Sequence, residues 1–82
     1  MIKVLFFAQI REVIGTDKLE LEASEGLTAE QLRQQLVTRG DKWQLALGDA
    51  NVLVAINQTL SGWDSAIASG DEVAFFPPVT GG

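Results

Sequence analysis

The sequence contains no cysteine and no histidine, and these two absences narrow its possible chemistry at once. Without cysteine the chain cannot form disulfides, zinc–thiolate sites, persulfides or thiol nucleophiles. Without histidine it lacks the commonest general base and the commonest transition-metal ligand. Any chemistry of this chain must therefore use carboxylates, hydroxyls, amines or the chain terminus, and we expect no bound metal.

Positive charge is scarce as well: 6 Lys and Arg stand against 11 Asp and Glu, a net charge of −5. Binding to nucleic-acid phosphates needs the opposite balance, so we expect no nucleic-acid partner and favour a basic protein partner. No run approaches the roughly 20 apolar residues of a membrane span, and the N-terminus lacks a signal-peptide cleavage site. We therefore expect a soluble cytoplasmic protein. Glycine-rich phosphate loops are missing too, so the chain is not expected to bind ATP alone.

The residues that are present predict one small domain, because 82 residues suffice for one modest core. Residues 1–10 alternate apolar side chains onto one face, a pattern that predicts a first strand. Leu19 and Leu21 alternate with glutamates and predict a second strand, which forms a hairpin with the first. Three more strands are expected, at residues 52–56, 59–60 and 72–76.

The clearest helix begins after Thr28. Thr28 and Gln31 have the spacing of a capping box, and Leu27 and Leu32 occupy the hydrophobic-staple positions around it. Gly40 is the expected C-cap of this helix. Its buried stripe at helical spacing consists of Ala29, Leu32, Leu36 and Val37.

Two lesser elements complete the predicted order β-β-α-(α)-β-β-β. A short helix is expected from Asp41 to Gly48, and Asp64 is expected to cap a single helical turn through Ile67. The first and last strands are the most apolar, so they are the natural central pair of a mixed sheet of about five strands. One main helix across one face of such a sheet is the α+β arrangement called β-grasp, or ubiquitin-like. It would occupy residues 1–76.

Residues 77–82 form a tail that is the most informative segment of the sequence. It reads Pro77, Pro78, Val79, Thr80, Gly81 and Gly82. Six residues reach about 20 Å when extended, and glycines let the backbone enter a channel too narrow for side chains. The geometry suits an acyl group at Gly82 that is presented to other enzymes' active sites. A frayed terminus, which commonly ends in small residues, is the alternative.

A second feature is the set of Phe7, Leu60 and Phe76. By alternation each points away from the helix-covered face, and together they would form an exposed apolar patch of the kind that marks an interaction surface. The alternative is that the segments around Trp43 or Trp63 cover this face. Asp71 and Glu72 do not suggest an acid–base pair, because adjacent strand residues point to opposite faces.

Three segments of the chain resemble the MoaD family, the small ubiquitin-like subunits of molybdopterin synthase. They span residues 4–15, 55–58 and 70–82, and the last, GDEVAFFPPVTGG, is the most specific. The resemblance implies that an E1-like adenylating enzyme uses ATP to activate the Gly82 carboxylate. A sulfurtransferase or cysteine desulfurase then supplies the sulfur of a thiocarboxylate. The tail donates this sulfur to precursor Z (cyclic pyranopterin monophosphate) in the large subunit's active site.

The resemblance also implies a heterotetramer of two small and two large subunits, with Phe7, Arg11, Leu60 and Phe76 at partner surfaces. In that role the chain binds no cofactor and is not an enzyme by itself. Three alternatives remain open at this point. A thiamine-pathway sulfur carrier shares the fold and the Gly-Gly end, although that family is usually shorter and lacks Phe-Phe-Pro-Pro. A ubiquitin-like modifier would join Gly82 to lysines, and a purely structural domain would not need its last two residues.

Overall fold

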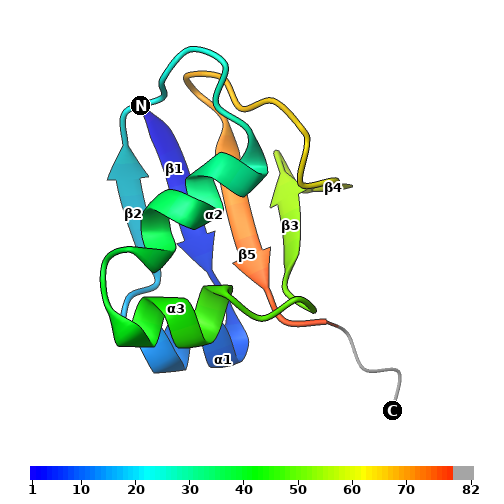
Figure 1. Ribbon diagram of the computed structural model, residues 1–82. Coiled ribbons are helices and arrows are strands. Elements are labelled where there is room, and N and C mark those ends of the chain that lie inside the picture. The colour runs from blue at the N-terminus through cyan, green and yellow to red at the C-terminus, as the bar shows by residue number, and fades with distance from the viewer. Residues whose placement is uncertain (79–82) are drawn as a thin grey trace.

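The computed structural model describes residues 1–78, which form one five-stranded sheet and three helices (Figure 1). The strands are β1 (Ile2–Phe6), β2 (Lys18–Leu21), β3 (Leu53–Ile56), β4 (Thr59–Ser61) and β5 (Glu72–Phe76), and the helices are α1 (Ala8–Ile14), α2 (Ala29–Val37) and α3 (Asp41–Leu47). The sheet order is β2-β1-β5-β3-β4. β1 and β5 are parallel neighbours, and the other pairs are antiparallel. The predicted β-grasp fold and its central strand pair are confirmed.

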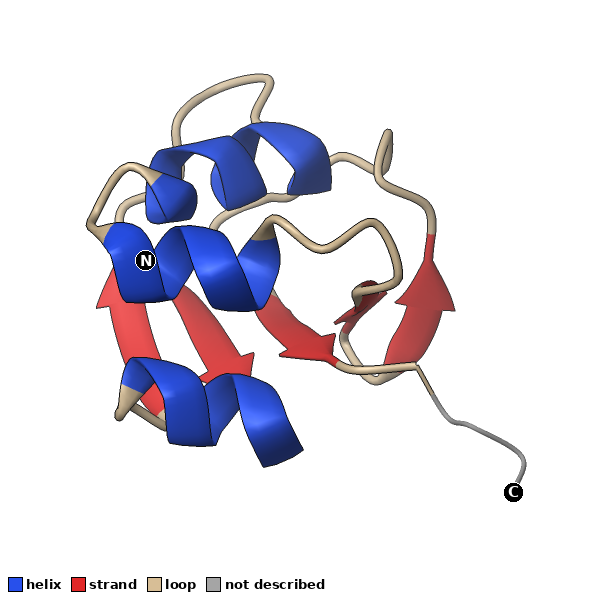
Figure 2. Ribbon diagram, turned by 60° about the horizontal axis from the view of Figure 1, so that its bottom comes forward, coloured by secondary structure: helices blue, strands red, loops and turns tan. Residues whose placement is uncertain are grey.

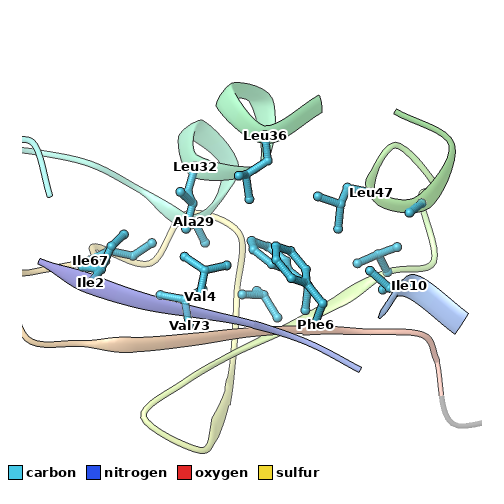
Figure 3. Close-up of a cluster of buried hydrophobic side chains, with 14 of the residues drawn as sticks. Ile2, Val4, Phe6, Ile10, Ala29, Leu32, Leu36, Leu47, Ile67 and Val73 are labelled. Carbon is cyan, nitrogen blue, oxygen red and sulfur yellow. The ribbon is translucent and has the colours of Figure 1, made fainter. Parts of the chain in front are cut away.

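The core lies between the sheet and α2, which crosses one face of the sheet (Figure 1). β1 and β5 bury every second side chain, as the predicted alternation requires. Leu32 and Leu36 project from α2 toward Val4 and Phe6 of β1 (Figure 3), and all four side chains are buried. Burial of such side chains contributes about 1.5–3 kcal/mol each. This core fixes the direction in which β5 delivers the C-terminal residues.

The start of α2 is held by the predicted capping box. The Gln31 backbone N–H donates to Thr28 Oγ1 at 3.2 Å, and the Thr28 N–H donates to Gln31 Oε1 at 3.1 Å. Leu27 and Leu32, the staple residues, are both buried. The remaining first-turn N–H groups of the helix must find acceptors elsewhere.

Those acceptors come from the loop after β4, where the predicted helical turn from Asp64 is wrong. The N–H groups of the first two α2 residues donate to the carbonyls of Ser65 and Trp63, at 3.0 and 2.9 Å. Ala66 adds an isolated β-bridge to Thr28. The loop makes only a turn at Trp63 and Asp64, where the Ser65 N–H donates to the Gly62 carbonyl at 3.1 Å, and its next carbonyls satisfy the start of α2 instead of forming a helix of their own.

The first strand is shorter than predicted. β1 ends at Phe6, and residues 8–14 form α1 instead of continuing the strand. Ile10 is buried, and Val13 and Ile14 pack against the core, so this segment uses helical spacing to bury one side. Gly15 ends the helix with a φ of 81°, and its N–H donates to the Arg11 carbonyl at 2.7 Å. β1 and β2 are antiparallel as predicted, but α1 joins them in place of a hairpin turn.

The end of α2 also differs from the prediction. Thr38 is the C-cap, and its hydroxyl donates to the Gln35 carbonyl at 2.6 Å. Gly40 instead precedes α3, which begins at Asp41 and is followed by Gly48 as predicted. The Thr38 hydroxyl satisfies a terminal carbonyl of α2, so the helix can end before it reaches the glycine.

α1 and α3 lie side by side at the end of the molecule where β5 leaves the sheet (Figure 1). Figure 2 turns this end toward the reader. Within residues 1–78, none of the helices has the length and apolar character needed to span a bilayer.

Candidate functional site

The face of the sheet that is turned away from α2 carries a continuous apolar surface, which we call the open face. Strand register places its side chains in two rows. One row contains Leu5, Ala74, Ala55 and Leu60, which are opposite one another on β1, β5, β3 and β4. The second row contains Phe7, Phe76 and Leu53, because Phe76 pairs with Leu53 and the Phe7 N–H donates to the Phe75 carbonyl. The rows are two residues apart along each strand, so they form one patch.

The predicted apolar residues all belong to this open face. Leu60 is 66% exposed and Phe7 is 44% exposed, whereas Phe76 is half-buried among its neighbours. Only four large hydrophobic side chains of residues 1–78 are exposed, and two of them lie here. Such clustering is typical of a surface that binds another protein.

Neither tryptophan covers the open face. Trp43 packs edge-on against the buried Phe6 ring, at 5.6 Å between centroids, and Trp63 stacks on the buried Phe75 ring at 5.9 Å. Phe6 and Phe75 belong to the core side of the sheet. The Arg33 guanidinium lies 4.3 Å from the centre of the Trp63 ring and holds it from outside. The alternative in which the tryptophan segments shield the far face is therefore wrong.

Charged residues of both signs surround the apolar rows. Lys3 pairs in register with Glu20 and with Glu72, and Leu5 pairs with Lys18. Lys3, Glu20 and Glu72 are on the end of the face that is farther from the C-terminal tail, and Lys18 is level with the Leu5 row at the β2 edge of the sheet. The end nearer the tail is apolar, with Phe7 beside Phe76.

Arg11 lies on α1 and not at the end of a strand as predicted. Its side chain is exposed and forms no ion pair with any residue from 1 to 78. The Arg11 N–H donates to the Phe7 carbonyl, so the two residues are one helical turn apart. A cation is thereby placed at the end of the open face from which the tail leaves.

The tail begins directly after β5, at Pro77 and Pro78. These prolines form one wall of a groove of about 250 Å³, whose other side is made by α1 and α3. We call it the tail-root groove; it is lined by Gln9, Ile10, Val13, Leu45, Ala46, Asp49, Asn51, Val52, Pro77 and Pro78. The predicted site residues Val79, Thr80, Gly81 and Gly82 lie outside the described residues.

Sequence reasoning did not find this groove. The residue that draws attention to the groove in the structure is Leu45 of α3, whose side chain is 72% exposed. A single exposed leucine is ordinary on a protein surface. Leu45 becomes part of a groove only because α3 packs against α1 beside the two prolines.

The acidic residues at the opposite end of the molecule have a structural role. Asp71 accepts hydrogen bonds from the Ala68 N–H at 2.8 Å and from the Asn57 side chain at 3.1 Å. These bonds, the first above all, lower the pKa of the Asp71 carboxyl. Glu72 contributes its N–H to the Asn57 side-chain oxygen. The cluster therefore ties the β3–β4 turn to the start of β5, and the residues from 1 to 78 include no group of metal-ligating side chains.

Comparison with known proteins identifies the family. Residues 4–82 match the model of the ThiS family. Over all 82 residues, the chain is 57% and 58% identical to the molybdopterin synthase sulfur carrier subunits of Escherichia coli and Haemophilus influenzae, and each alignment covers 100% of both proteins. The chain belongs to this family of sulfur carrier subunits. The MoaD resemblance of the three sequence segments is thereby confirmed.

A solved structure adds a likeness of fold. A chain in the complex of subunits 1 and 2 of molybdopterin-converting factor from Helicobacter pylori superimposes with a TM-score of 0.69, at 24% identity. The match covers 99% of this sulfur carrier family member and 97% of that chain. The shared part therefore includes the whole β-grasp domain.

Proposed function

We propose that this chain is the sulfur-carrying small subunit of a molybdopterin synthase and that Gly82 is the residue that carries the sulfur. The observation that carries the proposal is the full-length identity of 57–58% to curated sulfur carrier subunits, which extends through the last residue of both proteins. The lack of cysteine supports it, because no thiol in the chain could hold the sulfur instead. The proposal assigns this role to the C-terminal carboxylate, which adenylation can convert into a sulfur donor.

The proposed chemistry has two stages, and each needs another protein. An E1-like adenylating enzyme joins the Gly82 carboxylate to AMP with release of pyrophosphate, because a free carboxylate is a poor electrophile. The terminal sulfur of a persulfide on a sulfurtransferase or cysteine desulfurase then displaces AMP and forms an acyl disulfide, and a thiol reductant cleaves its S–S bond to leave the thiocarboxylate. In the large subunit this sulfur passes to precursor Z. The small subunit itself supplies no catalytic base and no cofactor in this scheme.

The open face is the proposed docking surface for the large subunit. Phe7, Leu60 and Phe76 supply its apolar anchors, and Arg11 supplies a cation at its margin. Interfaces of this type gain most of their affinity from a few buried apolar anchors. Docking here would place Pro77 and Pro78 next to the partner, so that the tail enters its active site. Two small and two large subunits would form the complete assembly, in the cytoplasm.

A reconstitution with purified components tests the proposal. The thiocarboxylated chain, the large subunit and precursor Z should yield molybdopterin, and a variant that lacks Gly82 should yield none. The deletion is informative only if it still binds the large subunit, so binding is measured in parallel. Molybdopterin formation by the deletion variant would show that Gly82 is not the sulfur carrier.

A further inference from the structure

The tail-root groove is a second feature of the surface that the open face does not include. Its floor is formed by the buried Ile10, Ala46 and Val52, and Leu45 rises from α3 at its rim. The groove lies between α1 and α3, at the end of the molecule that Figure 2 turns forward. Leu45 is therefore presented at a different surface from Leu60, which belongs to β4.

The size of the groove indicates what it can hold. Sites for small molecules and cofactors measure roughly 300–1,000 Å³, whereas this groove measures about 250 Å³ and is open to solvent. That volume suits one or two side chains of another protein better than a cofactor. The apolar floor and Leu45 favour an apolar side chain.

The charge of the rim indicates a second property of the occupant. Among the described residues that line the groove, Asp49 is the single ionisable one. One of its carboxylate oxygens accepts the Asn51 N–H at 2.9 Å, and the other has no hydrogen bond with residues 1–78. A neighbouring lysine or arginine of the occupant would complement this carboxylate, as would be expected for a chain of net charge −5.

The position of the groove indicates which protein the occupant belongs to. Pro77 and Pro78 form its wall, and the chain continues for four residues beyond Pro78. Four extended residues span about 14 Å. A protein whose active site encloses Gly82 must therefore lie within that distance of Pro78, which forms the wall of the groove.

We propose that the tail-root groove receives an apolar side chain, with a cation beside it, from the large molybdopterin synthase subunit. This inference rests on the proposed function, because it takes the large subunit as the protein that encloses Gly82. The contact would fix the angle at which the prolines direct the tail. The open face then supplies the main docking energy, and the groove supplies orientation.

Binding of the full-length chain to its large subunit tests the inference, measured by titration calorimetry at two salt concentrations. Leu45→Lys should weaken binding at least tenfold, because it removes the apolar contact and opposes the partner's cation. Leu45→Ala should weaken it about threefold to fivefold, and Leu45→Met should bind like the parent chain. Asp49→Asn, which keeps the acceptor for Asn51, should bind more weakly and with less dependence on salt.

The matched control is Gln44→Lys, which adds the same charge to the neighbouring exposed residue of α3 that does not line the groove. It should bind within twofold of the parent chain. Melting temperatures of all variants establish that the fold is intact, and substitutions of Leu45 remove little buried surface because this side chain is 72% exposed.

Three outcomes separate the two proposals. Failure of the parent chain to bind the large subunit would overturn the proposed function and this inference with it. Normal binding by the parent chain and by Leu45→Lys would overturn this inference alone. Loss of binding to the adenylating enzyme, with normal binding to the large subunit, would show that the groove belongs to a different partner and would contradict the assignment made here.

Discussion

At the residue scale, the proposed binding surfaces include large apolar side chains that are exposed and contribute little to the core. Leu60 and Leu45 are 66% and 72% exposed, whereas the core residues of β1 and β5 are almost fully buried. Substitutions at exposed positions usually change stability by less than about 0.5 kcal/mol. Variants of the open face should therefore report binding and not folding.

Leu60→Glu is predicted to weaken binding of the large subunit at least tenfold, or about 1.4 kcal/mol. The charge would have to be buried in the docked interface, at the β4 edge of the open face, without a partner to compensate it. Surface plasmon resonance against the immobilised large subunit measures the change. The matched control is Thr59→Glu, on the same strand but on its other side, and it should bind within about threefold of the parent chain. Equal losses in both variants would contradict the proposed role of the open face.

Asp71→Asn is predicted to reduce the amount by which the melting temperature falls as the pH is lowered. The folded-state pKa of Asp71 is lowered from 3.8 by the Ala68 and Asn57 hydrogen bonds, so its carboxylate stabilises the fold above that pH. This stabilisation is lost as the pH falls below 3.8 toward the lower folded pKa. Thermal melting from about pH 7 to pH 3 should show a smaller decrease for the variant than for the parent chain.

Asp17→Asn is the control for that experiment, because the exposed Asp17 carboxylate accepts no hydrogen bond from residues 1–78. It should follow the parent chain over the same pH range. If Asp71→Asn followed the parent chain as closely, the hydrogen bonds of Asp71 would not contribute to acid stability.

Alternation in the sequence was enough to predict the exposed face at the residue scale. Phe7, Leu60 and Phe76 were assigned to one face from their period of two, and the strand register confirms it. Arg11, which the family resemblance places at a partner surface, is exposed, but it lies on a helix that alternation does not predict. Leu45 could not be assigned a role, because its groove exists only once α1, α3 and the prolines have packed together.

At the element scale, capping residues predict the start of α2 correctly, whereas no helix follows the predicted cap Asp64. Thr28 and Gln31 placed the start of α2 to the residue. α1 was missed because Phe7, its N-cap, makes no side-chain cap, and because the apolar alternation of β1 runs on through Ala8 and Ile10. The signal that could have found α1 is the spacing of Ile10, Val13 and Ile14, which repeats at helical intervals.

Thr28→Ala is predicted to lower the free energy of unfolding by about 1 kcal/mol. The substitution removes the acceptor for the Gln31 N–H, which lies at the start of the helix that covers the core. For a domain of this size the melting temperature should fall by about 4–8 °C. Differential scanning calorimetry measures the shift.

The matched control for the cap is Gln35→Ala, at an exposed position in the last turn of the same helix. Its side chain makes no hydrogen bond with residues 1–78, and alanine favours the helix. The control should melt within about 2 °C of the parent chain. A comparable loss in both variants would indicate that the helix as a whole, and not its cap, limits stability.

At the scale of the whole molecule, we expect the fold and the proposed reactive end to be independent. Among the described residues, the buried core extends from Ile2 to Phe75, seven positions before Gly82. The deletion is predicted to leave the free energy of unfolding unchanged within about 0.5 kcal/mol while it abolishes sulfur transfer. Urea titration of both chains measures the first part. A marked loss of stability would mean that the terminus also supports the fold.

The sequence gives the length of the segment that follows β5, and the position of β5 in the sheet determines where that segment begins. The central position of β5, next to β1 and β3, was predicted from its apolar composition and is confirmed. The neighbours of the tail root could not be predicted, because they depend on a helix that the sequence did not reveal. The net charge of −5 argues against a nucleic-acid partner, but it does not indicate which protein is the partner.

The most direct test of the central claim is the intact mass of the chain after incubation with ATP, sulfide and an adenylating enzyme of its family. A mass gain equal to the replacement of one oxygen by one sulfur is predicted, and the chain without Gly82 should show no gain. An unchanged mass, with an adenylating enzyme proven active on another carrier, would contradict sulfur carriage at Gly82. Conjugates of higher mass on a denaturing gel would then identify the chain as a protein modifier.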